Sequence, residues 1–138
     1  LNKSITENLT EYEINEFKSD LVVSNATIEH VGNFNNQSKM ILNTIKLTKK
    51  AFVIITPNRY HPIDFHTKLF FIHWFKKNIH RRILKILGLK YFANEKNLNL
   101  LSKNDLENLL RFNNFSNYKI LNIKFLFFKS NFIVIGRV

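Results

Sequence analysis

The chain has 138 residues, 45% of them hydrophobic, and carries a formal net charge of +11 with no cysteine. This length suits one domain that buries about two-thirds of the surface of its unfolded chain. Disulfides and thiolate metal sites are excluded, no apolar run reaches the length of a membrane span, and no secretory pattern is found, so a cytoplasmic location is expected. The charge is compatible with a nucleic-acid or anionic-membrane partner. The lysines are dispersed rather than clustered, however, so a proteome bias toward Lys and Asn is the preferred explanation.

Residues 1–18 are polar and, for this chain, acidic. We expect them to be a frayed segment at the edge of the domain.

Regular structure is expected to begin within D-L-V-V-S-N-A-T-I-E-H-V, residues 20–31. Leu21–Val23 are apolar without alternation, which predicts a parallel strand buried on both faces between helix layers.

Small polar residues follow this strand: Ser24, Asn25 and Ala26. They mark its carboxyl end, where open α/β sheets bind ligands. Glu29 and His30 come next, so a carboxylate and an imidazole are expected near the same opening.

A helix and a second buried strand come next. Near-helical spacing relates Met40, Ile41, Ile45 and Leu47. Asn35 or Asn36 is the expected cap of this helix. Residues 51–55 form a solid apolar strand, which ends at Pro57 because proline has no N–H to donate. A strand–helix–strand unit is a parallel crossover, so the first strand should end beside residues 57–59.

Residues 60–75, Y-H-P-I-D-F-H-T-K-L-F-F-I-H-W-F, are the most unusual passage. Three histidines, an aspartate and many aromatic residues directly follow the carboxyl end of a strand. Beyond this passage, a helix capped by Asn78 is expected to end at Gly88.

The last third of the chain predicts one more helix and a hairpin. Ser102 and Asp105 form an S-x-x-D capping box at the start of the helix. Alternating hydrophobicity predicts a strand over residues 121–127. A turn at residues 129–131 would lead into a final apolar strand at residues 132–135.

The 20–31 motif, the order of the elements after it and the terminal hairpin resemble class I S-adenosylmethionine-dependent methyltransferases. The resemblance runs from residue 20 to the C-terminus and implies an α/β fold, the C-terminal part of a Rossmann-like methyltransferase sheet with parallel strands and a terminal antiparallel hairpin. No glycine-rich nucleotide loop occurs in the sequence. Residues 1–138 are therefore interpreted as a single partial domain, whose cofactor-binding N-terminal half is expected before Leu1.

The resemblance also implies roles for individual residues. The cofactor would be S-adenosylmethionine, bordered by Ser24, Asn25, Ala26 and His30. The runs T-P-N-R-Y-H-P, D-x-H-T and I-H-W are similar to a subset of bacterial small-molecule methyltransferases, in which the segment after the fifth strand covers the acceptor. Residues 60–101 are accordingly expected to be a substrate-covering insertion.

In this interpretation His61 and His66 are the candidate catalytic bases, because imidazole titrates near neutral pH. The candidate substrate contacts are Asn58, Arg59 and His73. For each histidine, a partly buried ring bonded to the backbone remains an alternative. No metal site is expected, because His61-x-x-Asp64-x-His66 lacks both a third firm ligand and the H-E-x-x-H spacing.

The leading hypothesis is methyl transfer to a small-molecule or lipid-linked acceptor, by a chain that is inactive in isolation. One alternative is a nucleic-acid-binding module, although the aromatic residues lie in apolar runs and no basic recognition helix is found. The other is binding to a membrane surface without catalysis. Residues 69–90 favour this alternative because aromatic and basic residues adjoin there. A peripheral membrane contact is also compatible with a lipid-linked acceptor.

Overall fold

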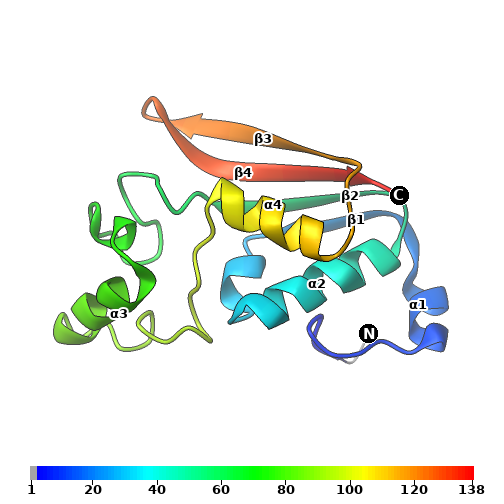
Figure 1. Ribbon diagram of the computed structural model, residues 1–138, viewed down its shortest axis with the longest axis horizontal. Coiled ribbons are helices and arrows are strands. Elements are labelled where there is room, and N and C mark those ends of the chain that lie inside the picture. The colour runs from blue at the N-terminus through cyan, green and yellow to red at the C-terminus, as the bar shows by residue number, and fades with distance from the viewer. Residues whose placement is uncertain (1–2) are drawn as a thin grey trace.

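In the computed structural model, which describes residues 3–138, a four-stranded sheet carries α2 and α4 on one face and a separate lobe at one end (Figure 1). Residues 1 and 2 of the predicted domain lie outside the described residues. The elements in chain order are α1 (Glu11–Phe17), β1 (Ser19–Asn25), the 3-10 helix η1 (Ile28–His30), α2 (Phe34–Lys46), β2 (Thr48–Pro57), the 3-10 helix η2 (Ile72–Trp74), α3 (Lys77–Ile86), α4 (Lys103–Phe112), β3 (Tyr118–Phe125) and β4 (Phe128–Arg137). Among the described residues, no helix has both the length and the hydrophobicity needed to cross a membrane.

The strands lie in the order β1-β2-β4-β3. β1 and β2 run parallel, whereas β4 runs antiparallel to both of its neighbours, β2 and β3. The predicted α/β sheet of parallel strands with a terminal antiparallel hairpin is confirmed. Asn25 pairs with Ile55. β2 therefore continues two residues past the end of β1 before Asn58 and Arg59 follow at the same edge.

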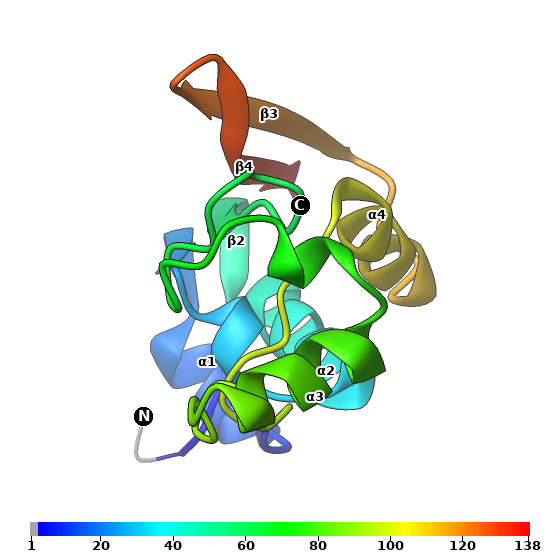
Figure 2. The same cartoon turned by 90° about the vertical axis from the view of Figure 1, so that its left-hand side faces the viewer.

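Only one face of β1 is packed, so the prediction that both faces are buried is wrong. Val22 packs against the core, but Leu21 and Val23 are 55% and 58% exposed. The physical reason is that α2 and α4 both cover the same face of the sheet (Figures 1 and 2). An apolar run predicts burial only if a second layer covers the strand, and none of the described helices does so here.

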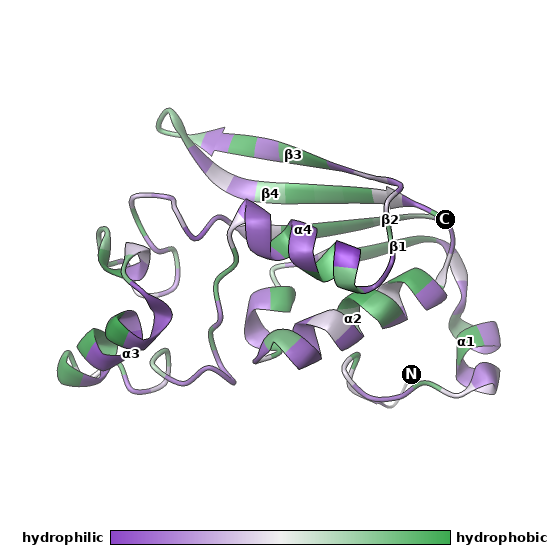
Figure 3. Ribbon diagram, in the orientation of Figure 1, coloured by the Kyte–Doolittle hydropathy of each residue, from purple (hydrophilic) through white to green (hydrophobic). Residues whose placement is uncertain are grey.

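The uncovered face is apolar across the full width of the sheet. β2 and β4 are hydrophobic over most of their length (Figure 3). Strand pairing and the alternation of side chains place these residues on the uncovered face: Leu21, Val23, Val53, Ile55, Leu121, Ile123, Ile133 and Ile135. β1 also has no strand partner on its outer side in the described structure. An apolar face of this kind and an unpaired edge are typical of surfaces that contact further protein or a membrane.

The core lies between the sheet and the two helices. Its buried side chains are Ile28, Met40, Ile41, Phe52, Ile54, Leu101, Leu106, Leu109, Leu110, Phe132 and Val134. Gly136 on β4 is required by this packing, because a Cβ at that position would overlap the Phe52 ring and lie 2.8 Å from Phe115.

The helix starts follow local capping chemistry, which the sequence predicts unevenly. The capping box of Ser102 and Asp105 at α4 is confirmed. α2 begins earlier than predicted, because the Asn33 side chain accepts a hydrogen bond from the N–H of Asn36. The prediction that Asn78 caps α3 is wrong, because α3 begins at Lys77 without a side-chain cap. The prediction that Gly88 ends this helix is confirmed, since Gly88 follows the end of α3 with φ +77°.

Two further predictions need correction. The segment expected to fray contains α1, whose start is held by a capping box between Thr10 and Glu13. The hairpin turn lies at Leu126-Phe127 and not at residues 129–131, which belong to β4. Both turn residues have positive φ, +48° and +69°, without the glycine or asparagine that usually signals such a turn.

Candidate functional site

The lobe beside the sheet consists of residues 58–101, which connect β2 to α4. The two ends of this segment are paired with each other. Asn58 and Leu101 form a parallel β-bridge, and the Arg59 N–H donates to the Leu101 carbonyl at 3.0 Å. The two ends of the lobe therefore lie side by side, beyond the carboxyl end of β2 (Figure 1). Residues 60–101 lie within this lobe, and their role as a substrate-covering insertion stays a prediction.

Asp64 organises the first loop of this lobe. One carboxylate oxygen accepts from the His66 N–H at 3.0 Å and faces His66 Nδ1 at 3.2 Å, and the other accepts from the Thr67 hydroxyl at 2.7 Å. Burial disfavours the charged form of Asp64, but the hydrogen bonds from His66 and Thr67 outweigh it and hold the pKa at about 2. Asp64 therefore fixes the orientation of the His66 ring.

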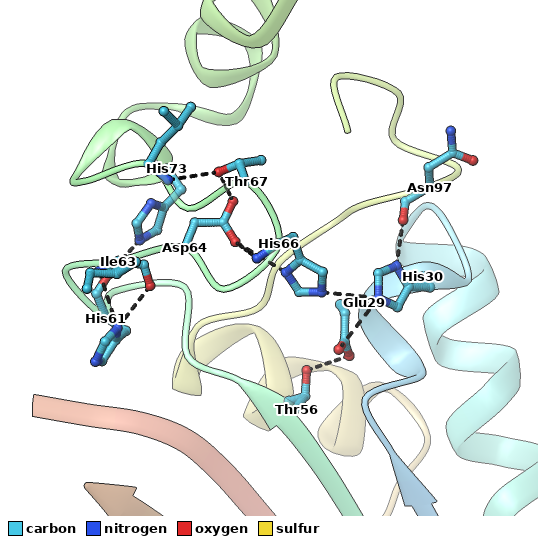
Figure 4. Close-up of polar contacts among 11 residues, drawn as sticks. Glu29, His30, Thr56, His61, Ile63, Asp64, His66, Thr67, His73 and Asn97 are labelled. Carbon is cyan, nitrogen blue, oxygen red and sulfur yellow. Dashed lines mark hydrogen bonds and ion pairs between the residues drawn. The ribbon is translucent and has the colours of Figure 1, made fainter. Parts of the chain in front are cut away.

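The loop brings His66 against η1, which follows β1. The Nε2 atoms of His66 and His30 lie 3.1 Å apart, and His30 Nδ1 lies 2.6 Å from the Asn97 carbonyl (Figure 4). Glu29 precedes His30 and is fully buried, and its carboxylate accepts from the Thr56 hydroxyl at 2.8 Å. Two imidazoles and a carboxylate thus meet where β1 and β2 end.

His61 and His73 lie inside the lobe and not in this cluster. His61 is 1% exposed, stacks on Phe65 at 4.7 Å and turns Nδ1 toward the Ile63 carbonyl at 2.9 Å. His73, also 1% exposed, donates from Nε2 to the His61 carbonyl at 2.6 Å, and burial lowers its pKa. Their proposed roles toward an acceptor stay predictions.

The other two predicted substrate contacts are engaged with the backbone. Arg59 donates to the carbonyls of His73 at 3.1 Å and Phe75 at 2.7 Å. Asn58 donates to the Lys129 carbonyl at 2.8 Å and accepts from the Tyr60 N–H at 2.9 Å. Both side chains therefore hold the lobe in place, whether or not they also contact a substrate.

The predicted cofactor residues form the end of β1. Ser24 has a buried hydroxyl with no hydrogen-bond partner among the described residues, whereas Asn25 and Ala26 are exposed. Ala26 adopts φ +50°, and its N–H donates to the Ile55 carbonyl at 2.9 Å. The left-handed conformation is uncommon for a residue with a Cβ, and it turns the chain sharply away from the sheet.

Comparison of the sequence with protein-family models and with curated proteins gives no match. Solved structures resemble the fold. Magnesium protoporphyrin IX methyltransferase from Synechocystis PCC 6803 with bound SAH has a TM-score of 0.54 at 15% identity, over 98% of this chain and 48% of that one. An O-methyltransferase family protein from Burkholderia thailandensis gives 0.58 at 14% identity, over 99% and 34%. A SAM-dependent methyltransferase from Archaeoglobus fulgidus gives 0.55 at 11%, over 100% and 66%.

The chain has a class I methyltransferase-like fold. It spans about half or less of the first two of these structures. In this methyltransferase-like fold, the cluster of Glu29, His30 and His66 lies at the strand ends, the edge at which open α/β sheets bind ligands.

Sequence reasoning placed Glu29 near the opening of the methyltransferase-like sheet but gave it no role. The available signal was the adjacent Glu29-His30 pair directly after a strand end. The contacts that Asn97 and Asn99 make with the segment after β1 were not predicted. Asn99 donates from its backbone N–H to the Glu29 carbonyl at 2.7 Å and from its side chain to the Gly32 carbonyl at 2.8 Å. No local pattern in the sequence marks such a contact between distant loops.

Proposed function

We propose that the chain is the C-terminal part of an S-adenosylmethionine-dependent methyltransferase that acts on a small-molecule or lipid-linked acceptor. The observation that carries this proposal is the methyltransferase-like sheet with its polar cluster at the strand ends. One similar structure contains SAH, the demethylated form of that cofactor. Nucleic acid is not the expected partner.

The strand-end residues fit a cofactor with polar groups. The unpaired, buried hydroxyl of Ser24 has hydrogen-bonding capacity that no described residue uses. Asn25 and Ala26 are exposed, and the small side chains of Ser24 and Ala26 let a ligand approach the backbone closely. His30 follows on η1. Bound there, S-adenosylmethionine would supply the methyl group from its sulfonium.

His66 is the proposed base for the acceptor. Its Nδ1 is directed at Asp64, which leaves Nε2 to take a proton. The His66 side chain is 16% exposed, whereas His61 and His73 are each only 1% exposed. Among the candidate histidines of the lobe, His66 therefore has the best access to an acceptor.

The proposal includes a longer chain. The glycine-rich loop that would hold much of the cofactor does not occur in the sequence. The uncovered apolar face and the free edge of β1 fit a covering layer of helices and strands. We propose that a segment of the same protein preceding Leu1 supplies this layer, in agreement with the partial coverage of the similar structures.

The surface of the lobe favours a lipid-linked acceptor or a lipid surface. Its exposed apolar residues are Phe70, Phe71, Trp74, Phe75, Ile79, Ile86 and Leu87. Lys76, Arg82 and Lys85 are exposed beside them. Aromatic and basic side chains in this combination are typical of interfacial membrane contacts. The lobe could thus bring the strand-end site to an acceptor held in a membrane.

The direct test is methyl transfer. The protein extended by its preceding segment would be incubated with S-adenosylmethionine labelled in the methyl group, together with aqueous and lipid extracts of its host. The proposal expects label in an acceptor of one extract, and less label with His66→Ala. No transferred label in either extract, from a protein that binds the cofactor, would contradict it.

A further inference from the structure

The two facing imidazoles of His30 and His66 have the same protonation pattern. His30 Nδ1 is 2.6 Å from the Asn97 carbonyl, and His66 Nδ1 is 3.2 Å from a carboxylate oxygen of Asp64. A carbonyl and a carboxylate accept hydrogen bonds, so each Nδ1 carries the hydrogen. With both rings neutral, the two Nε2 atoms present lone pairs to each other at 3.1 Å. This arrangement is repulsive unless a cation, either a proton or a metal ion, lies between them.

Glu29 supplies a third electron-pair donor at the same point. One of its carboxylate oxygens lies 3.9 Å from His30 Nε2 and is buried without a hydrogen-bond partner among the described residues. The other oxygen is held by Thr56. A fully buried carboxylate with a single hydrogen bond is costly unless a positive charge compensates it. One atom from each of Glu29, His30 and His66 lies within 4.8 Å of the others.

We propose that Glu29, His30 and His66 bind a divalent transition-metal ion of the zinc type. Tetrahedral ligands at metal–nitrogen distances of about 2.0–2.1 Å lie about 3.3 Å apart. The 3.1 Å between the two Nε2 atoms fits this geometry, whereas the Glu29 oxygen, 3.9 Å from His30 Nε2, has to move closer to the metal. Two imidazoles and one carboxylate suit zinc and its neighbours better than magnesium or calcium.

The surroundings are those of a built metal site. Each ligating histidine donates its other ring N–H to a fixed acceptor, which orients the ring and raises its basicity. η1 and the lobe are tied together by Asn99, so the ligands come from two well-anchored segments. The side chains of His30 and His66 are 37% and 16% exposed, which leaves an entry path. Three protein ligands also leave a coordination position for a water or a substrate oxygen.

This inference would replace the expectation, drawn from the sequence, that the chain has no metal site. That expectation considered His61 and His66, whose side chains do not come together in the structure. The side chains of residues 29, 30 and 66 do come together. The inference does not rest on methyl transfer, and its test needs neither cofactor nor acceptor. It is an alternative to the proposed role of His66 as base, because an Nε2 atom bound to a metal ion has no lone pair left to take a proton.

The experiment is titration of zinc into the purified, chelator-treated protein, with cobalt absorption as an independent record of the ligand set. The expected result is one saturable site that loses affinity by about 100-fold or more with His30→Gln or His66→Gln. Asp64→Asn should cost less, about 10–100-fold, because it acts through His66. Glu29→Gln keeps the Thr56 hydrogen bond and should remove the carboxylate contribution to the cobalt spectrum.

His80→Leu, a histidine change in α3 outside the cluster, is the matched control and should leave zinc affinity unchanged. Circular dichroism identifies any variant that fails to fold. Saturable binding that the His30→Gln and His66→Gln variants lose and the control keeps supports the proposal. Equal binding by all variants, or no saturable binding by the folded parent protein, overturns it; the two histidines would then share only a proton.

Discussion

His30 and His66 are 36 residues apart in the sequence, yet their Nε2 atoms lie 3.1 Å from each other. The contact joins the turn after β1 to the lobe that follows β2. It exists because β1 and β2 are parallel and end at the same edge of the sheet. The site therefore depends on the crossover and on the closure of the lobe at Asn58 and Leu101.

If His66 is the base for the acceptor, His66→Ala lowers turnover far more than it lowers affinity for S-adenosylmethionine. A positioned general base contributes about 100-fold or more, so kcat should fall by at least that factor. The measurement is steady-state kinetics together with cofactor titration, on the extended protein. Lys39→Ala, an exposed change on α2 away from the site, is the comparison and should leave both quantities unchanged. Equal losses of kcat and cofactor affinity would return His66 to a structural role.

Stability should fall in mild acid because of His80. Burial lowers the pKa of His80 to about 4, against about 6.5 in the unfolded chain. Between these two values the unfolded chain binds a proton that the folded protein does not. The free energy of unfolding therefore decreases as the pH falls from 6.5 to 4, by up to about 1.4 kcal/mol per pH unit.

Urea denaturation across this pH range checks the prediction. His80→Leu should reduce the slope of stability against pH, whereas Lys85→Ala on the exposed side of α3 should leave it unchanged. An unchanged slope in a folded His80→Leu variant would show that His80 titrates alike in both states.

Gly136→Ala should destabilise the fold by about 1–3 kcal/mol, because the new methyl group overlaps the Phe52 ring. Gly88→Asn is the control, since no other atom lies within 4 Å of a Cβ there and asparagine tolerates positive φ. Combining Gly136→Ala with Phe52→Leu should cost less than the sum of the two single changes. Strict additivity in urea denaturation would place the strain elsewhere.

The lobe should bind anionic lipid vesicles. Replacing Lys76, Arg82 and Lys85 with serine is expected to weaken binding, since each basic residue near the surface contributes about 1 kcal/mol. Lys77 and Arg81 are less suitable, because they bond Asn99 and Glu95. The same substitution of Lys39, Lys46 and Lys49, which are exposed on α2 and β2, is the charge-matched control. The measurement is the fraction of protein that cosediments with the vesicles at low salt. Equal losses of binding in the two triple variants would refute a specific contact of the lobe.

Much of the fold could be predicted because its signals are local. The Ser102–Asp105 capping box, Gly88 after α3 and the apolar run of β2 each depend on a few adjacent residues. The position of the hairpin turn was missed because Leu126 and Phe127 carry no turn signal.

The site was harder to predict. Parallel strands indicated the correct edge, and His30 and His66 were named, but their contact depends on the path of the lobe. The burial of His61 and the pairing of Arg59 with backbone carbonyls likewise arise from tertiary structure. The exposure of Leu21 and Val23 depends on what covers the sheet, which an apolar run alone does not specify.

The most direct test of the proposed methyltransferase is calorimetric titration of S-adenosylmethionine into two proteins. One is the 138-residue chain, and the other is the same chain extended by the segment that precedes Leu1. We predict saturable binding only by the extended protein, because the preceding segment would supply the glycine-rich loop and cover the apolar face of the sheet. Tight binding by the 138 residues alone, or no binding by a folded extended protein, would contradict the proposal.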